Sequence, residues 1–406
     1  MTTSSPSSAD LTRQRAMRFV VLLGLVSLLA DVTYEGARSM VGPFLQSLGA
    51  SAAVVGLSVG FGEFVGYAVR LLSGYLSDRT GRYWALTLLG YGLNLLAVPA
   101  LALAGHWPLA VALLVVERFG KALRAPARDA MLSHAAHRVG PGWGFGLHEA
   151  MDQIGAMLGP LLVAGVLAWR GGYRTGFAVL AGPALLALAV LVVARWLYPR
   201  PRDLEVARPR LEAQGLDVRF WLYMVAVALV AAGFADFALV AYHLGRWQVF
   251  APAWIPVLYA LAMGVDALAA LVFGRLYDRW GVRALLVSTV LAAGFAPLAF
   301  TTRPVWVLGG LVLWGVGMGA QESVLRAVVA RLAPPERRAT AYGVFNTGYG
   351  LAWFAGSALM GWLYDHSLPA LMAFSVLVQL AAVPVLARLA TWNGTTGIWQ
   401  PPRLRL

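Results

Sequence analysis

Long apolar runs alternate with short polar segments along most of the chain. A helix that crosses the hydrocarbon core of a bilayer needs about 20 mostly apolar residues. The runs are continuous and lack the polar–apolar alternation of a membrane β-barrel. The pattern therefore predicts twelve spanning helices, at 18–46, 51–77, 83–104, 107–133, 142–169, 173–197, 219–246, 251–277, 283–301, 304–332, 339–366 and 368–390.

One polar stretch, between the sixth and seventh runs, divides the chain into two groups of six. It carries several prolines and charges of both signs, which is typical of a linker. The predicted parts are an N-terminal tail (1–17), a six-helix bundle (18–197), a linker (198–218), a second six-helix bundle (219–390) and a C-terminal tail (391–406).

Composition supports this interpretation, because the 406 residues are 59% hydrophobic and 13% charged, whereas soluble domains carry roughly 25% charged residues. The formal charge of +13 suggests nucleic acid, but the arginines lie between the apolar runs, as membrane topology requires. We therefore expect a lipid bilayer and no nucleic acid as partner. Cysteine is absent, which excludes disulfides and thiolate metal sites. The first ten residues lack the apolar core of a signal peptide and are predicted to form a disordered tail.

Orientation follows from the arginines of the loops, which accumulate on the cytoplasmic side of a membrane. Most of these arginines lie on one side of the membrane, next to the termini, the linker and the loops of that side. The opposite side holds Arg170, Arg174, Arg246 and Arg303. We therefore expect both termini and the linker in the cytoplasm, in a bacterial inner membrane.

The two halves contain an internal repeat. The loop from Gly74 to Arg82 (GYLSDRTGR) recurs in degenerate form from Gly274 to Arg283 (GRLYDRWGVR), and both loops follow the second span of their half. The further matches are Gly146 with Gly343, Gly159 with Gly356, and Ala30-Asp31 with Ala235-Asp236. Repeated six-helix halves related by an axis along the membrane normal are a transporter architecture.

The segment GYLSDRTGR resembles the signature loop of the major facilitator superfamily, G-x-x-x-D-R-x-G-R, at the place where that family carries it. The resemblance covers nearly the whole chain. It implies an all-α integral membrane fold of twelve helices in two pseudo-symmetric six-helix bundles, and transport by alternating access.

The resemblance also implies that this loop is a conformational latch. Asp78, which we place near the start of the third span, would pair with an arginine near the cytoplasmic end of the fourth. Gly81 permits a tight turn, and Gly74 a close helix contact. The alternative is that the charges only set topology. The predicted latch residues are Gly74, Asp78, Arg79, Gly81, Arg82, Arg124 and Arg128.

The fifth span is similar to the front of the antiporter motif of the family's drug exporters, with Gly146, Gly155, Gly159 and Pro160 in register. Val163 and Ala164 stand where the motif ends in two glycines. The match favours export by antiport, and a glycine-rich packing face is the alternative. The family's arginine motif of the fourth span is not matched, because Arg118 has the wrong spacing.

Many ionisable residues fall inside the spans, although each costs roughly 2.5–3.5 kcal/mol at mid-bilayer on insertion scales. Those at the centre of a span are Asp31, Glu63, Lys121, Asp152, Asp236, Asp266 and Glu322. In the resembling fold the first, fourth, seventh and tenth spans line a central cavity, with the fifth, eighth and eleventh beside it. The predicted proton-coupling and substrate residues are Asp31, Glu35, Arg38, Lys121, Glu149, Asp152, Asp236 and Glu322.

Among these, Asp31 with Glu35 is the first choice for the proton site, and Glu149 with Asp152 the second. A carboxyl group that loses its hydration binds a proton more readily, and a neighbouring cation favours its ionised form. The alternative is that the acids only neutralise buried cations such as Lys121, Arg124 and Arg38.

Other functional classes find less support. His148 and Asp152 have the i, i+4 spacing of two metal ligands, but we expect no resident metal and no cofactor. No nucleophile–base motif or P-loop occurs, so we expect no enzyme. Trp314 and Trp353 lie deep in their spans and either pack or contact substrate. The sequence predicts a monomeric, proton-coupled exporter of a small amphiphilic or cationic solute. The alternatives are uptake or facilitated transport of a nutrient, metabolite or divalent metal ion, and, more remotely, a membrane enzyme or sensor.

Overall fold

The computed structural model describes residues 8–139, 141–199, 217–333 and 338–391, and these ranges contain helices and turns but no strand. In the first half, six helical segments follow the six predicted spans; the third ends in a 3-10 turn and the sixth is interrupted at Leu180. The helices are α1 (Ser8–Ser47), α2 (Ala52–Thr80), α3 (Tyr83–Ala100), α4 (Trp107–Val139), α5 (Pro141–Arg170), α6 (Tyr173–Val179) and α7 (Ala181–Leu197).

The second half also has six segments, and three of them are interrupted. A π-helical turn, Gln321–Leu325, joins the two parts of the tenth span. The helices are α8 (Val218–Gly233) and α9 (Phe237–Arg246) in the seventh span, α10 (Trp254–Trp280), α11 (Arg283–Ala293) and α12 (Phe295–Ala299) in the ninth, α13 (Pro304–Ala320) and α14 (Arg326–Leu332) in the tenth, α15 (Arg338–His366) and α16 (Leu368–Thr391). Each predicted span is thus mostly helical where the structure describes it.

In the described ranges, 9 helical segments are long and apolar enough to cross a membrane. The predicted all-α membrane fold is confirmed. Helix α1 begins at Ser8, ten residues before the predicted span, so Ser8 to Asp10 are helical and not a disordered tail. Hydropathy marks where a span enters the bilayer, not where its backbone hydrogen bonds begin. Residues 1–7 and most of the predicted linker and C-terminal tail lie outside the described residues.

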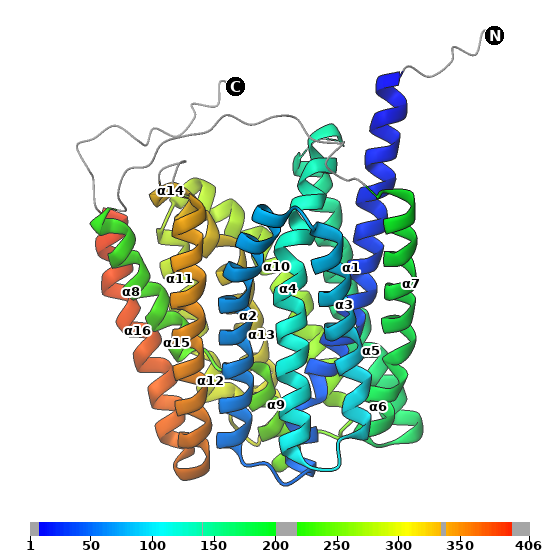
Figure 1. Ribbon diagram of the computed structural model, residues 1–406. Coiled ribbons are helices and arrows are strands. Elements are labelled where there is room, and N and C mark those ends of the chain that lie inside the picture. Colours follow the sequence, from blue (N-terminus) through cyan, green and yellow to red (C-terminus); the bar gives the residue numbers. More distant parts are fainter. Residues whose placement is uncertain (1–7, 140, 200–216, 334–337, 392–406) are drawn as a thin grey trace, which may run out of the picture.

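Helix α1 begins and α16 ends at the same end of the bundle, which we call the terminal end (Figure 1). The two halves are joined by hydrogen bonds at the opposite end. The carboxylate of Asp365, near the end of α15, accepts hydrogen bonds from the backbone N–H groups of Ala52 and Ala53. The Tyr242 hydroxyl donates to the carbonyl of Ala50 at 3.3 Å.

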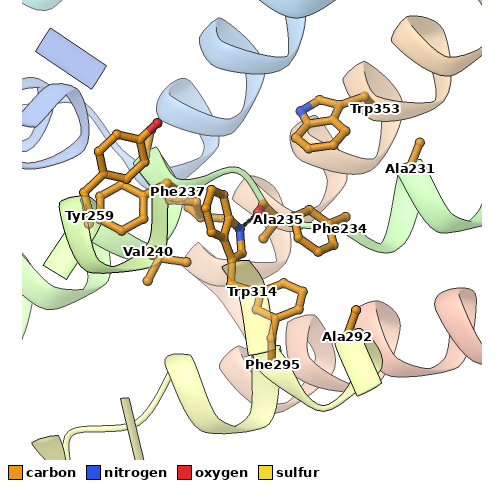
Figure 2. Packing of buried hydrophobic residues seen from close by; sticks show 14 of the residues in the cluster. Ala231, Phe234, Ala235, Phe237, Val240, Tyr259, Ala292, Phe295, Trp314 and Trp353 are labelled. Carbon is orange, nitrogen blue, oxygen red and sulfur yellow. Dashed lines mark hydrogen bonds between the residues drawn. The ribbon is translucent and has the colours of Figure 1, made fainter. Parts of the chain in front are cut away.

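The interruption between α8 and α9 is built from specific contacts. The Asp236 carboxylate accepts the N–H of Ala238 at 2.9 Å and so caps α9. Trp314 Nε1 donates to the carbonyl of Ala235 at 2.9 Å (Figure 2). Ser375 Oγ donates to the Gly233 carbonyl at 2.7 Å. Backbone groups released at mid-membrane must find partners inside the protein, and these bonds provide them.

Equivalent glycine contacts occur in both halves. A Cβ at Gly159 of α5 would overlap the carbonyl of Val32 in α1, and a Cβ at Gly356 of α15 would overlap that of Ala232 in α8. The two glycines are 197 positions apart, and the residues that they meet, Val32 and Ala232, are 200 positions apart, as the internal repeat predicts. With Val32 matched to Ala232, however, Ala30-Asp31 and Ala235-Asp236, 205 positions apart, are not structurally equivalent.

Candidate functional site

A polar cavity of about 200 Å³ lies between the halves. Its walls come from α1, α2, α4 and α5 of the first half and from α10, α13, the π-helical turn, α14 and α15 of the second. Water-facing charges inside a membrane protein mark functional paths. The ionisable residues that line the cavity are Asp31, Glu35, Arg38, Glu63, Arg70, Arg118, Lys121, Glu149, Asp152, Asp266, Glu322 and Arg326, together with Tyr34, Tyr67 and Tyr349.

Arg38 of α1 connects the two halves. Its Nη2 lies 2.7 Å from Oδ2 of Asp236, which is only 3% exposed. The same nitrogen is 3.7 Å from Glu63, and Nη1 is 3.9 Å from Glu35. Asp236 thus bonds the N-terminus of α9 with one carboxylate oxygen and the guanidinium of Arg38 with the other. Charge-assisted bonds of this kind are the strong ones.

A second set of bonds continues this network into α4. Arg118 Nη2 lies 3.2 Å from Glu63, and its Nε lies 3.4 Å from Glu117. Asn94 of α3 donates to Oε1 of Glu117 at 2.8 Å. The alternative interpretation, that acids neutralise buried cations, therefore fits Glu63 and Glu117.

Glu35 is held from both halves. Besides its contact with Arg38, it accepts a hydrogen bond from the hydroxyl of Tyr259 in α10, and both residues are buried. Protonation of Glu35 removes its negative charge, which changes the hydrogen bond from Tyr259 and weakens the attraction to Arg38. This carboxylate is therefore placed where protonation changes a contact between the halves.

Asp31 and Lys121 lie in the same cavity, but in the described part of the chain Asp31 forms no ion pair within 4 Å. Lys121 Nζ stands 3.6 Å from the centre of the Tyr34 ring, a cation–π contact. Asp31 is 5% exposed. It is therefore a carboxylate without a direct cation, unlike Glu63 or Asp236.

The acids of α5 reach the cavity from its other side. Glu149 and Asp152 line it, and His148 Nε2 is 3.7 Å from Oδ2 of Asp152. No cluster of three or more histidines, aspartates and glutamates suited to a metal ion occurs among the described residues. His243 bonds the Tyr364 hydroxyl at 2.9 Å and the carbonyl of Thr301 at 3.2 Å.

Seven of the eight predicted cavity residues line the cavity, and the eighth, Asp236, bonds Arg38 beside it. The prediction of these residues' roles in coupling and binding remains untested. The prediction omitted five charged lining residues, namely Glu63, Arg70, Arg118, Asp266 and Arg326. Glu63 and Asp266 carried the necessary signal, a charge at the centre of a span.

The role of the predicted latch residues stays a prediction, and the structure shows only where they lie. Gly81 ends α2 with φ +64° and donates its N–H to the carbonyl of Ser77, which is the expected tight turn. Asp78 lies in the last turn of α2, not at the start of α3 as predicted, because the helix continues to Thr80. Its side chain is outside the described residues.

The other predicted latch residues are placed as follows. Gly74 faces Pro126 of α4 at ordinary contact distance, 3.7 Å from a built Cβ. Arg79 donates to Tyr75 at an exposed position. Arg124 is buried over the Tyr91 ring at 4.0 Å. Arg128 bonds Ser27 and Asp129, each at 2.9 Å, and Arg82 precedes α3.

In the antiporter-like motif, a Cβ at Gly155 would overlap the carbonyl of Leu28, and one at Gly159 that of Val32. Gly146 has open space around it, and Pro160 lies inside α5. Two of the three glycines thus serve helix packing. Of the two deep tryptophans, Trp314 is fully buried and packs, whereas Trp353 lines the cavity with no hydrogen bond from Nε1 in the described chain.

Comparison with known proteins is consistent with this geometry. A family model described as Major Facilitator Superfamily matches residues 23–249 and 219–405. The chain is 46% identical over 377 residues to Uncharacterized protein Rv2265 of Mycobacterium tuberculosis, covering 91% of this chain and 92% of the relative. It is 27% identical over 361 residues to Uncharacterized MFS-type transporter MJ1317 of Methanocaldococcus jannaschii, covering 86% and 89%.

A more distant relative has a functional name. Multidrug resistance protein MdtH of Photorhabdus laumondii is 26% identical over 337 residues, covering 79% of this chain and 80% of the relative. Among solved structures, the nucleoside transporter NupG superposes with a TM-score of 0.71 at 12% identity, over 91% of this chain and 98% of that one. A bacterial homolog of the lysosomal transporter Spinster, in an inward-facing and unoccupied conformation, gives 0.68 at 16% identity, over 93% and 95%.

Proposed function

The chain belongs to the major facilitator superfamily, and on this premise we propose that it exports a small amphiphilic or cationic solute from a bacterial cytoplasm in exchange for protons. The termini and the linker face the cytoplasm in this proposal, and the protein works as a monomer. The name of the MdtH relative agrees with export of such solutes.

The observation that carries the proposal is the network around Arg38. Two buried carboxylates, Glu35 and Asp236, hold this guanidinium, and their contacts cross from one half of the molecule to the other. Protonation of either acid removes a charge that binds Arg38. The balance between open and closed arrangements of the halves then depends on proton occupancy, which antiport requires.

The transport cycle follows from this balance. With the acids ionised, the cavity receives a cationic solute from the cytoplasm. A change of state exposes the cavity to the outside, where a proton binds an acid such as Asp31 or Glu35 and the solute leaves. The return to the first state carries the proton inward, where it is released.

Vesicle transport tests this proposal. Purified protein in liposomes is given the fluorescent cation ethidium and an imposed pH gradient. We expect uphill ethidium movement towards the more acidic compartment, with proton movement in the opposite direction, and collapse of both by a protonophore. Ethidium movement that only follows its own concentration gradient, at any pH difference, contradicts proton coupling and favours facilitated transport.

A further inference from the structure

The two halves are in direct backbone contact near the end of the bundle that lies opposite the terminal end, which we call the opposite end. A Cβ at Gly60 or Gly56 of α2 would overlap Ser357 of α15, and a Cβ at Gly361 would overlap the carbonyl of Ala52. Small residues allow helices to approach this closely in a membrane. We call these contacts between α2 and α15 the glycine seam.

The glycine seam separates the cavity from the opposite end. The cavity-lining residues of α2 begin at Glu63, which follows Ala52 by about 16 Å along the helix axis. On α15, the cavity is lined by Tyr349 and Trp353, which precede the seam residue Ser357. Alternating access opens such a cavity to each side in turn. A solute that passes through the opposite end therefore requires α2 and α15 to part.

Asp365 of α15 holds the last turn of this seam. Its Oδ1 accepts the N–H of Ala52 at 3.2 Å, and its Oδ2 accepts the N–H of Ala53 at 2.8 Å. Both N–H groups belong to the first turn of α2, where a helix has no internal acceptor for them. A carboxylate at this position is also favoured by the helix dipole. Asp365 thus caps a helix of the opposite half, in addition to the cap that Ser51 provides within α2.

Arg246, the last residue of α9, is a second partner for the same carboxylate. Its Nη1 lies 3.8 Å from Oδ1 of Asp365, which is longer than a hydrogen bond. Helices α9 and α15 belong to the same half and are joined there, because His243 bonds the Tyr364 hydroxyl at 2.9 Å. The Arg246 guanidinium lies 5.8 Å from the centre of the Tyr364 ring. Arg246 therefore stays beside Asp365 when the halves part.

We propose that Asp365 is a positioning residue of the transport cycle, which holds the first turn of α2 while the opposite end is closed and pairs with Arg246 while that end is open. When the halves part, the N–H groups of Ala52 and Ala53 pass to water, and the guanidinium closes on the carboxylate. The Arg246 side chain is 48% exposed and has room for this movement. Asp365 keeps a partner in both states, so neither state leaves its charge uncompensated.

The two partners of Asp365 have opposite effects on the balance between the states. The bonds to α2 exist only in the closed state, whereas the pair with Arg246 is tighter in the open one. Loss of the carboxylate therefore favours opening, and loss of the guanidinium favours closing. This inference concerns the change of state alone. It depends on neither proton coupling nor the direction of transport.

Thiol labelling of the full-length protein in detergent tests the switch, with a water-soluble maleimide and a single Ser357→Cys reporter in the seam. Ser357 is 3% exposed, and the chain contains no cysteine of its own. We expect Asp365→Ala to speed labelling at least about twofold and Arg246→Gln to slow it about twofold. The double variant labels like Asp365→Ala, because Arg246 acts through Asp365. His366→Gln, whose ring stacks on Trp362 of its own helix, is the matched control and keeps the rate of the reporter protein.

An unchanged rate in either single variant overturns the inference. Faster labelling of Arg246→Gln also overturns it, because the guanidinium then only supports the closed contact. Arg246→Gln changes an exposed side chain, so its sign decides the matter even if Asp365→Ala fails to fold. Labelling needs neither solute nor a pH gradient, and a failure of export or of proton coupling leaves its outcome unaffected. Conversely, ethidium export by a protein whose two variants label normally rejects the switch and leaves the exporter intact.

Discussion

Single residues in and beside this cavity have more than one partner, and Asp236, beside it, shows the consequence most clearly. One of its oxygens caps α9 and the other binds Arg38 of the opposite half. Removing one partner of a buried pair costs about 3–5 kcal/mol when the other charge is left alone. Here Arg38 keeps Glu35 and Glu63 within 4 Å, so we expect a smaller loss.

The two roles of Asp236 can be separated by two substitutions. Asp236→Asn keeps a capping side chain, whereas Asp236→Ala loses the cap at an additional cost of about 0.5–2 kcal/mol. We expect the unfolding midpoint in detergent to fall in the order wild type, Asn variant, Ala variant. Equal midpoints for the two variants contradict a capping role.

The Asn variant also tests the bridge between the halves. Because the protein has no cysteine, a single Ser357→Cys label reports on the contact of α15 with Gly56 of α2. We expect faster labelling by a thiol reagent when Asp236→Asn is added. An unchanged labelling rate means that this ion pair does not hold the halves together.

Asp78 is predicted from the loop resemblance alone, since its side chain is not described. We expect Asp78→Asn to reduce transport while membrane insertion and thermal stability stay as in wild type. Asp217→Asn, at an exposed position just before α8, controls for the loss of one negative charge. Wild-type transport by Asp78→Asn reduces the loop to a topology signal.

Elements pack through glycines whose positions the sequence reveals only partly. The repeat pointed to Gly159 and Gly356, and both meet a neighbouring helix backbone. The same motif included Gly146, which meets nothing within 4 Å. A glycine in a span is visible in the sequence, but the rotation of its helix, which decides what it touches, is set by the neighbouring helices.

Two glycines of α5 provide a matched test of this packing. A methyl at Gly159 overlaps the α1 backbone, whereas Gly165 has open space. Overpacking costs roughly 1–3 kcal/mol, and alanine favours a helix over glycine by up to about 1 kcal/mol. We expect Gly159→Ala to lower the unfolding midpoint and Gly165→Ala to keep or raise it. The reverse order contradicts the described α1–α5 contact.

At the scale of the whole molecule, hydropathy and the repeated loop predicted the twelve helical segments and their order. They did not predict the interruption at Phe234–Asp236 or the π-helical turn, because partners such as Trp314 and Tyr349 that stabilise them come from distant spans. The acids that line the cavity were predicted correctly on those spans that the family resemblance places at the centre of the molecule. Glu63 and Asp266 were missed because the second span was not counted as lining the cavity and the eighth only as lying beside it.

The central claim is that carboxylates in this cavity couple proton movement to export. Two fluxes in proteoliposomes test it together, uphill ethidium transport under a pH gradient and ethidium exchange without one. We expect Asp31→Asn, Glu35→Gln, Glu149→Gln or Asp152→Asn to abolish uphill transport in at least one case and to spare exchange, because exchange needs no net proton movement. If all four variants still accumulate ethidium against its gradient, these acids are structural partners of buried cations, and the claim is wrong.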